Sequence, residues 1–192
     1  MKKLILVFLL AGIVLSSVFA ESETDGFSYP MRKSNATIYG AYLGTQGADS
    51  FVSGFGGGFH GKSHLFGTPL FYYGGIGVGY PANLPSPGKF SLYVDSAMGF
   101  GYKIVLPARF VLAIGAGISL FLITDDIYYD SNNMFALTYG VDILAEVQYC
   151  ITEDIYASFM FEPTIDILNN GGISFRPQAK LGIGFQMGRA LW

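Results

Sequence analysis

The stretch from Phe135 to Cys150, FALTYGVDILAEVQYC, alternates along its whole length between two sets of side chains. Successive side chains of a β-strand point to opposite faces, so this pattern predicts one long strand. One face is apolar, and the other carries Asp142 and Glu146. The stretch exceeds the ~5 to 6 residues typical of strands in globular proteins, whereas a tilted strand that spans a membrane needs ~9 to 11.

Similar segments recur along the chain, separated by stretches rich in Gly, Pro, Asn, Asp or Ser, as turns are. The eight predicted strands are 36–43, 51–60, 68–80, 89–103, 109–122, 134–150, 155–167 and 174–192. Glycine is frequent on their less apolar faces, for example at Gly75, Gly77 and Gly117. The inside of a small barrel is narrow, so residues without a side chain are expected to point into it. We therefore expect the apolar faces to meet lipid and the carboxylates to face a lumen. Closure into a barrel follows, because an open edge in hydrocarbon would leave backbone groups unpaired.

The first 20 residues have the features of a cleaved secretory signal peptide. Lys2 and Lys3 precede an apolar run, and Ala20 follows in a position that a signal peptidase reads. We assign residues 1–20 to the signal peptide, residues 21–34 to an N-terminal periplasmic segment and residues 35–192 to the barrel. Charged residues make up only 13% of the chain, against about 25% in a typical soluble domain, which also favours a membrane protein.

Charge and cysteine content exclude several classes of partner. Without Lys2 and Lys3 the mature chain has nine Lys plus Arg against fourteen Asp plus Glu, so its net charge of −5 argues against nucleic acid. Cys150 is the only cysteine and cannot form an internal disulfide. Cys150, His60 and His64 are too few of the usual ligands for a zinc site, and we expect no metal and no cofactor.

The signal peptide, the eight alternating segments and the final strand KLGIGFQMGRALW resemble the small eight-stranded outer-membrane β-barrels of the OmpA, OmpX and OmpW types. This resemblance implies an all-β fold, an eight-stranded antiparallel transmembrane β-barrel. It implies a location in the outer membrane of a diderm bacterium, with outer-membrane lipid around the barrel. It further implies that Phe185 and the terminal Trp192 belong to the signal that the barrel assembly machinery reads.

Aromatic residues are expected at two rims, since amphipathic rings favour membrane interfaces. We place Tyr42, Tyr80, Phe90, Phe121, Phe135 and Phe175 near one rim and Tyr102, Tyr149, Phe185 and Trp192 near the other. The odd-numbered connections include the longest and most acidic one, so both termini are expected at the rim with short turns. That acidic connection is predicted to be an exposed loop with Asp125, Asp126, Tyr128, Tyr129 and Asp130.

Seven charged residues are predicted to form a lumenal charge network. They are Arg109, Asp142, Glu146, Glu162, Asp166, Arg176 and Lys180. If the last hairpin is centred near Gly171, Glu162 lies opposite Lys180 and Asp166 lies opposite Arg176, and charges directly opposite on neighbouring strands interact.

The preceding strands contribute the rest of this network. A turn centred near Thr152 would place Asp142 beside Glu162, and Arg109 would approach Glu146 from the strand before it. If these charges fill the lumen, the protein is a plugged structural or interaction scaffold. If they line an open path, it is a narrow channel for the passive passage of small solutes. The exposed loop could instead bind an extracellular ligand, since loops on a rigid scaffold often carry function.

An enzyme is the remaining alternative, since some barrels of this architecture modify the acyl chains of lipopolysaccharide. Such an enzyme needs a His and a Ser near the outer rim as base and nucleophile. His60, Ser63 and His64 instead fall in a segment predicted to be a turn on the periplasmic side. We interpret them as turn residues and do not expect an enzyme.

Overall fold

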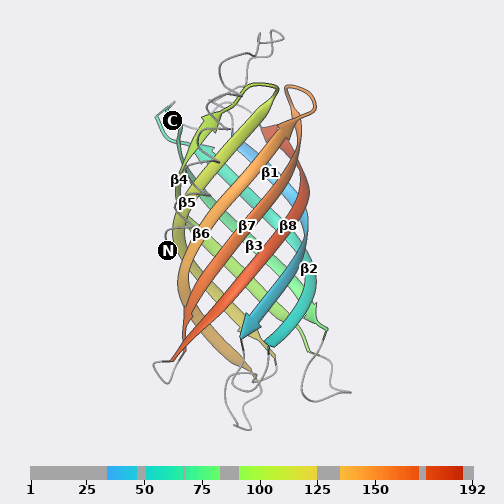
Figure 1. The fold of residues 1–192 in the computed structure, drawn as a ribbon, viewed down its shortest axis with the longest axis vertical. Coiled ribbons are helices and arrows are strands. Elements are labelled where there is room, and N and C mark those ends of the chain that lie inside the picture. The colour runs from blue at the N-terminus through green and yellow to red at the C-terminus, as the bar shows by residue number, and fades with distance from the viewer. Residues whose placement is uncertain are drawn as a thin grey trace, which may run out of the picture.

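The structure is a computed structural model that describes residues 34–46, 51–66, 68–82, 91–124, 135–168 and 172–187. Its strands are β1 (Ser34–Gln46), β2 (Phe51–His64), β3 (Leu70–Pro81), β4 (Tyr93–Val105), β5 (Phe110–Ile123), β6 (Ala136–Cys150), β7 (Ile155–Ile167) and β8 (Ile173–Met187). Each strand pairs antiparallel with its neighbour in sequence, and β1 pairs with β8, so the sheet closes into a barrel (Figure 1). The predicted eight-stranded antiparallel barrel is confirmed. Within the described ranges, no helix is long and apolar enough to cross a membrane.

Within the described residues, the predicted strand ends agree with the observed ones to within four residues. The largest differences are at the start of β4, which begins at Tyr93 instead of residue 89, and at the end of β2. This strand continues to His64 instead of ending at residue 60, because Lys62 pairs with Asn35 of β1 and His64 pairs with Phe71 of β3. Ser34, predicted to end the periplasmic segment, is the first residue of β1. The predicted signal peptide and residues 188–192 lie outside the described residues.

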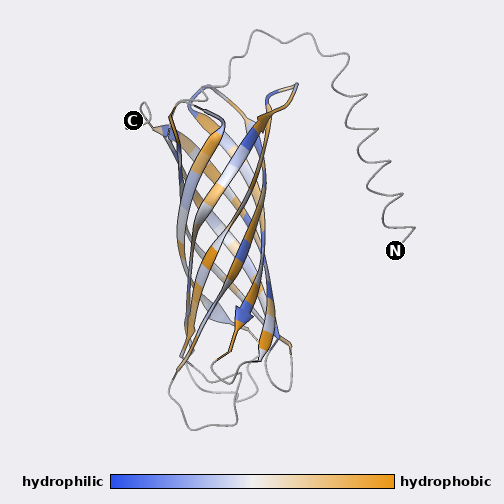
Figure 2. Ribbon diagram, turned by 90° about the vertical axis from the view of Figure 1, so that its left-hand side faces the viewer, coloured by the Kyte–Doolittle hydropathy of each residue, from blue (hydrophilic) through white to orange (hydrophobic). Residues whose placement is uncertain are grey.

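Side chains alternate between buried and more exposed positions along most of each strand. In β6 every second residue from Ala136 to Cys150 is buried, and the residues between them include exposed Val141 and Ile143. Figure 2 shows this alternation as changes between orange and white or blue along each strand. A water-soluble barrel would bury its apolar face, whereas here the apolar face is outside and the polar face is inside. The outer surface is therefore suited to lipid, and we treat the barrel as membrane-spanning.

The two ends of the barrel differ in their connections. The longest connections, 82–92 and 124–135, lie at the end opposite to the start of β1 and the end of β8. We call this the loop end and the other the termini end. The connections at the termini end are 65–69, 106–109 and 151–154. This asymmetry is the one expected from the sequence.

Most of the predicted rim aromatics that the structure describes are exposed. They are Tyr42, Tyr80, Phe135 and Phe175 towards the loop end and Tyr102, Tyr149 and Phe185 towards the termini end. The prediction for Phe121 is wrong: its side chain is buried in the lumen and packs against Tyr93. Phe121 shares the inward face of β5 with Val111 and Ala113, so the two-residue period points it inward. Phe90 and Trp192 lie outside the described residues.

Glycines on the inward face of β4 and β5 let these strands come close together. Gly99 pairs with Gly117, and Gly101 pairs with Gly115. A Cβ atom on Gly117 would lie 2.7 Å from the Cα of Gly99 and would also meet the carbonyl oxygen of Met98. The inner side of the wall therefore has no room for a side chain at this position.

Replacing Gly117 by Val should destabilise the barrel by about 1–3 kcal/mol, since the added atoms overpack the inner wall. Unfolding by urea in lipid vesicles, followed by circular dichroism, would measure this change. Gly74→Val is the matched control, because Gly74 is exposed and a Cβ there would be 3.9 Å from its nearest neighbour, the carbonyl oxygen of Ala97. Equal stability of the two variants would contradict the packing argument.

Candidate functional site

The lumen is lined by charged side chains that are almost completely buried. These are Lys62, Asp95, Lys103, Asp142, Glu146, Glu162, Asp166, Arg176 and Lys180, together with His60 and His64. Each lies on the inward face of a strand, since it occupies a buried position between two more exposed neighbours or at a strand end. All of the predicted lumenal charges except Arg109 are among them.

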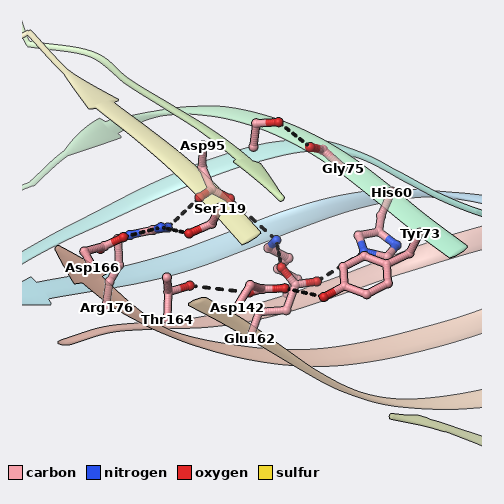
Figure 3. A network of polar contacts seen from close by, with 12 residues as sticks. His60, Tyr73, Gly75, Asp95, Ser119, Asp142, Glu162, Thr164, Asp166 and Arg176 are labelled. Carbon is pink, nitrogen blue, oxygen red and sulfur yellow. Dashed lines mark hydrogen bonds and ion pairs between the residues drawn. The ribbon is translucent and has the colours of Figure 1, made fainter. Parts of the chain in front are cut away.

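Arg176 is the centre of the network nearer the loop end (Figure 3). Its Nε donates to Asp166 Oδ2 at 2.8 Å and its Nη2 to Oδ1 at 3.2 Å, so the pair is bidentate. Its Nη1 contacts Asp95 of β4, and its Nη2 also donates to Ser119 Oγ at 3.0 Å. The guanidinium lies 4.6 Å from the centre of the Phe121 ring. A planar group with fixed donors suits this combination of bidentate pairing and stacking.

Lys180 joins this cluster to the next one. Its Nζ forms an ion pair with Glu162 and lies 3.7 Å from Asp95 Oδ2. The same Nζ is 4.9 Å from the centre of the Tyr39 ring. Asp95 thus contacts both cations, Arg176 through Oδ1 and Lys180 through Oδ2. One carboxylate from β4 therefore bridges the barrel to two residues of β8.

Hydroxyl groups and a histidine extend the network across the lumen (Figure 3). Tyr73 donates its hydroxyl to Asp142 Oδ2 at 2.7 Å, and Thr164 donates to Oδ1 at 3.4 Å. The His60 ring is stacked on Tyr73 at a centroid distance of 5.4 Å. Its Nε2 lies 3.4 Å from Glu162 Oε1. Asp142 and Glu162 are thus parts of one continuous polar cluster.

A second ion pair lies closer to the termini end. Lys62 Nζ is 3.0 Å from Glu146 Oε1 and 2.9 Å from Oε2, and both side chains are fully buried. Ser158 donates to Glu146 Oε1 at 2.6 Å. This pair joins β2 to β6 directly across the lumen, since the two strands are not neighbours in the sheet.

The ion pairs expected in the last hairpin form, but not between directly opposite residues. Glu162 lies opposite Gln178 and Asp166 lies opposite Ser174, because the hairpin register differs by two residues from the predicted one. Lys180 and Arg176 reach their carboxylates diagonally, which long side chains can do.

The register between β6 and β7 is also shifted. Asp142 lies opposite Thr164 and not opposite Glu162.

Arg109 does not join the lumenal network. It lies in the 106–109 connection, and its Nη1 donates to the carbonyl oxygen of Ile151 at 3.4 Å. Glu146, the expected partner, is paired in the sheet with Ala113 and bound by Lys62. The chain turns before Arg109 can enter β5, so its side chain stays at the rim.

His60, Ser63 and His64 were expected in a turn, and this expectation is wrong. All three lie on β2 and are buried. Lys62 between them, and Asp95 and Lys103 on β4, are lumenal charges that were not predicted from the sequence. Continuing the two-residue alternation through each strand would have placed all three inside.

Clusters of buried, mostly apolar side chains lie towards both ends of the lumen. Towards the loop end they are Leu43, Val52, Tyr93, Phe121, Ile123 and Ala136. Towards the termini end they are Val111, Cys150 and Tyr156, with Tyr156 hydrogen-bonded to Thr37 at 2.8 Å. A third cluster, which includes Met160 and Leu144, fills the middle. An eight-stranded interior is just wide enough for such side chains to fill it.

Two of the predicted sites fall partly or wholly outside these observations. The loop with Asp125, Asp126, Tyr128, Tyr129 and Asp130 lies outside the described residues, as does Trp192. Phe185 is exposed on the outer face near the end of β8.

Removing Lys62 should destabilise the barrel strongly, because Glu146 would keep a buried charge without its cation. Lys62→Met should cost about 3–5 kcal/mol, and the double change Lys62→Met with Glu146→Leu should recover most of that loss. Chemical unfolding of both single variants and the double variant gives the coupling free energy. Additive losses would show that the pair is not coupled.

Comparisons with known proteins support the fold. No protein-family model matches the chain, and no curated protein matches its sequence. The crystal structure of Neisserial surface protein A (NspA) is similar with a TM-score of 0.60 and 11% identity, over 80% of this chain and 96% of that one. Ail, the attachment invasion locus protein of Yersinia pestis, is similar with a TM-score of 0.52 and 12% identity, over 81% and 99%. The chain therefore has the fold of the small eight-stranded outer-membrane β-barrels.

Proposed function

We propose that this protein is an integral outer-membrane barrel with a plugged lumen, which acts as a structural or interaction scaffold. The observation that carries the proposal is the position of Arg176. Its guanidinium is fully buried, bound to Asp95 and Asp166 from opposite parts of the wall and stacked on Phe121. Such a group ties β4, β7 and β8 together across the lumen and occupies the space that a solute would need.

The layered filling of the lumen supports the same role. A solute would have to pass the apolar cluster around Tyr93, then the ion pairs of Arg176 and Lys180, and then the pair of Lys62 and Glu146. Breaking a buried ion pair costs about 3–5 kcal/mol, so each charged layer opposes passage. A narrow channel for small solutes is the alternative, and it requires these side chains to move aside.

The proposed role is not enzymatic. A hydrolase or acyltransferase needs a nucleophile activated by a base. The Ser63 hydroxyl is hydrogen-bonded to Ser34 at 2.9 Å, and the His60 ring contacts Tyr73 and Glu162. These contacts fit a structural use of the histidine in the plug.

The proposed location is the outer membrane of a diderm bacterium, after export by the signal peptide of residues 1–20. The apolar outer surface and the likeness to outer-membrane barrels support it. Lipid and, during biogenesis, the barrel assembly machinery are the proposed partners. Ail is named for attachment and invasion, and by analogy the predicted loop at residues 125–130 is the proposed site for an extracellular ligand.

Conductance in a planar bilayer tests this function. The wild type should be silent, and Lys180→Ala should give small openings because Glu162 and Asp95 lose a cation and water enters the lumen. Arg109→Ala is the control and should stay silent, since Arg109 lies at the rim. Steady wild-type openings, with an ion preference that Lys180→Ala changes, would refute the plug and support the narrow channel.

A further inference from the structure

The ladder between β1 and β8 ends before the two strands do. Its last pair towards the loop end is Leu43 with Gln178, whereas β1 continues to Gln46 and β8 begins at Ile173. Continued in the same register within the described residues, the ladder would also contain Gly44–Pro177, Thr45–Arg176 and Gln46–Phe175. None of these pairs belongs to the ladder. We call this part of the wall, residues 44–46 and 175–177, the loop-end seam.

Pro177 is the reason that the ladder stops. Leu168 N donates to Gly172 O at 2.9 Å. Counted from this bond, every second pair of β7 and β8 is hydrogen-bonded, and the pair of Pro163 with Pro177 falls between two such pairs. The nitrogen of Pro177 therefore faces β1 and not β7. Proline has no N–H group, so the hydrogen bond that this position would donate to Gly44 is missing.

Pro163, directly opposite on β7, interrupts the ladder on the other side of the same hairpin without ending it. The β6–β7 ladder lacks pairs at Ile143 and Leu144, and it resumes with Asp142 opposite Thr164 and continues towards the loop end. The β7–β8 hairpin is thus attached to β6 up to its loop end. On the other side, its attachment to β1 through the backbone ladder stops at Gln178.

Side-chain contacts replace the ladder at the loop-end seam. Ser174 donates its hydroxyl to the carbonyl oxygen of Gln46 at 2.7 Å, and its Oγ lies 3.5 Å from Thr45 Oγ1. On β1 itself, the ring of Phe51 covers Gly44, where an added Cβ atom would run into it. The hydroxyl contacts need no N–H group from β8, and rotation of a side chain is enough to break them.

The strongest contacts of this part of β8 lead across the lumen. Arg176, which would be paired with β1 if the ladder continued, is fully buried and forms an ion pair with Asp95 of β4 (Figure 3). It also donates to Ser119 Oγ of β5 at 3.0 Å. Its other carboxylate partner, Asp166, lies on β7 and so belongs to the same hairpin. The loop-end part of β8 is therefore held to the opposite wall and not to its neighbour β1.

We propose that the barrel wall opens sideways at the loop-end seam, and that the ion pair of Arg176 with Asp95 is the latch that keeps it shut. With the pair intact, the start of β8 is drawn towards β4. Without it, the start of β8 moves away from β1 together with β7, while the ladder from Ser34 to Leu43 stays closed. Regions with few backbone hydrogen bonds are the ones that open locally.

This inference goes beyond the scaffold role. It depends on the contacts of Arg176 and not on a lumen that is closed to ions, so the conductance of the Lys180→Ala variant neither supports nor contradicts it.

Spin labels across the seam test the latch. In a Cys150→Ala background, one label pair is attached at Gln46→Cys and Phe175→Cys, the outward positions of the loop-end seam. A reference pair is attached at Ile38→Cys and Ile183→Cys, which are exposed and directly opposite within the ladder. The full-length protein is reconstituted in dimyristoyl phosphatidylcholine vesicles. The broadening of the electron paramagnetic resonance spectrum by coupling between the two labels reports their distance.

Asp95→Asn removes the latch. It should about halve the broadening at the loop-end pair and leave the reference pair unchanged, since a buried ion pair is lost while the ladder remains. Asp166→Asn is the matched control, because it removes the same kind of carboxylate from the same guanidinium but from within the hairpin. Its seam should stay shut. Pro177→Ala, which adds an N–H group facing β1, should restore the wild-type broadening in the Asp95→Asn protein, and Pro163→Ala should not.

Four results would overturn the proposal. They are a loop-end pair that Asp95→Asn leaves unchanged, an equal change at both label pairs, a seam that Asp166→Asn opens as far as Asp95→Asn does, and equal rescue by the two proline variants. Circular dichroism checks that each variant is folded. If Asp95→Asn does not fold, amide exchange with deuterium in the wild type replaces it. The Phe175 amide should exchange about tenfold faster than that of Leu181, which faces β1 inside the ladder, and equal rates would also overturn the proposal.

Discussion

In hydrocarbon, a backbone N–H or C=O group has no water to bind, and the pairing of β1 with β8 removes the two open edges that would otherwise expose such groups. The rest of this structure depends on that closure. Closing only eight strands leaves a narrow interior, so every inward side chain must fit among those of the other strands. Glycine is therefore needed where the inner faces of two neighbouring strands leave no room for a side chain, as at Gly99 and Gly117, and a large inward residue such as Tyr73 takes the space left by a glycine, here Gly115.

The same closure determines how the charges are used. A charged group inside a narrow barrel has lost most of its water, and it is tolerated only with a partner. Arg176 accordingly has carboxylates from β7 and β4, and Lys62 has one from β6. Several of these pairs join strands that are not neighbours in the sheet. They add cross-links that the backbone ladder cannot provide, and they specify which strands face each other across the lumen.

The fold, and the face of most strands that points into the lumen, could be predicted from the sequence. The reason is that the two-residue period along a strand is preserved even when its ends are misjudged by a few residues. It was insufficient where turn-forming residues lie inside a strand. The segment GKSH has the composition of a turn, yet its residues pair with β1 and β3, and the error hid Lys62 and both histidines. Register was the second limit, since a hairpin centre misplaced by one residue shifts every cross-strand pair by two, as for Glu162. Asp95 could be placed on the inward face from its strand, but its contact with Arg176 crosses the lumen and depends on closure.

Inside and outside are coupled in this barrel through the thickness of a single sheet. An inward glycine leaves no side chain in the lumen. At Gly117 an added Cβ atom would meet backbone atoms of Met98 and Gly99, so the two strands themselves would have to move apart. A side chain added to the inner wall at β4 or β5 would therefore also shift the outward residues of the same two strands. The reverse does not hold for an outward residue such as Ala116, because its side chain does not enter the lumen. The outer face can thus vary while the lumenal network stays intact, whereas the lumenal network cannot vary at these glycines without changing the outer face.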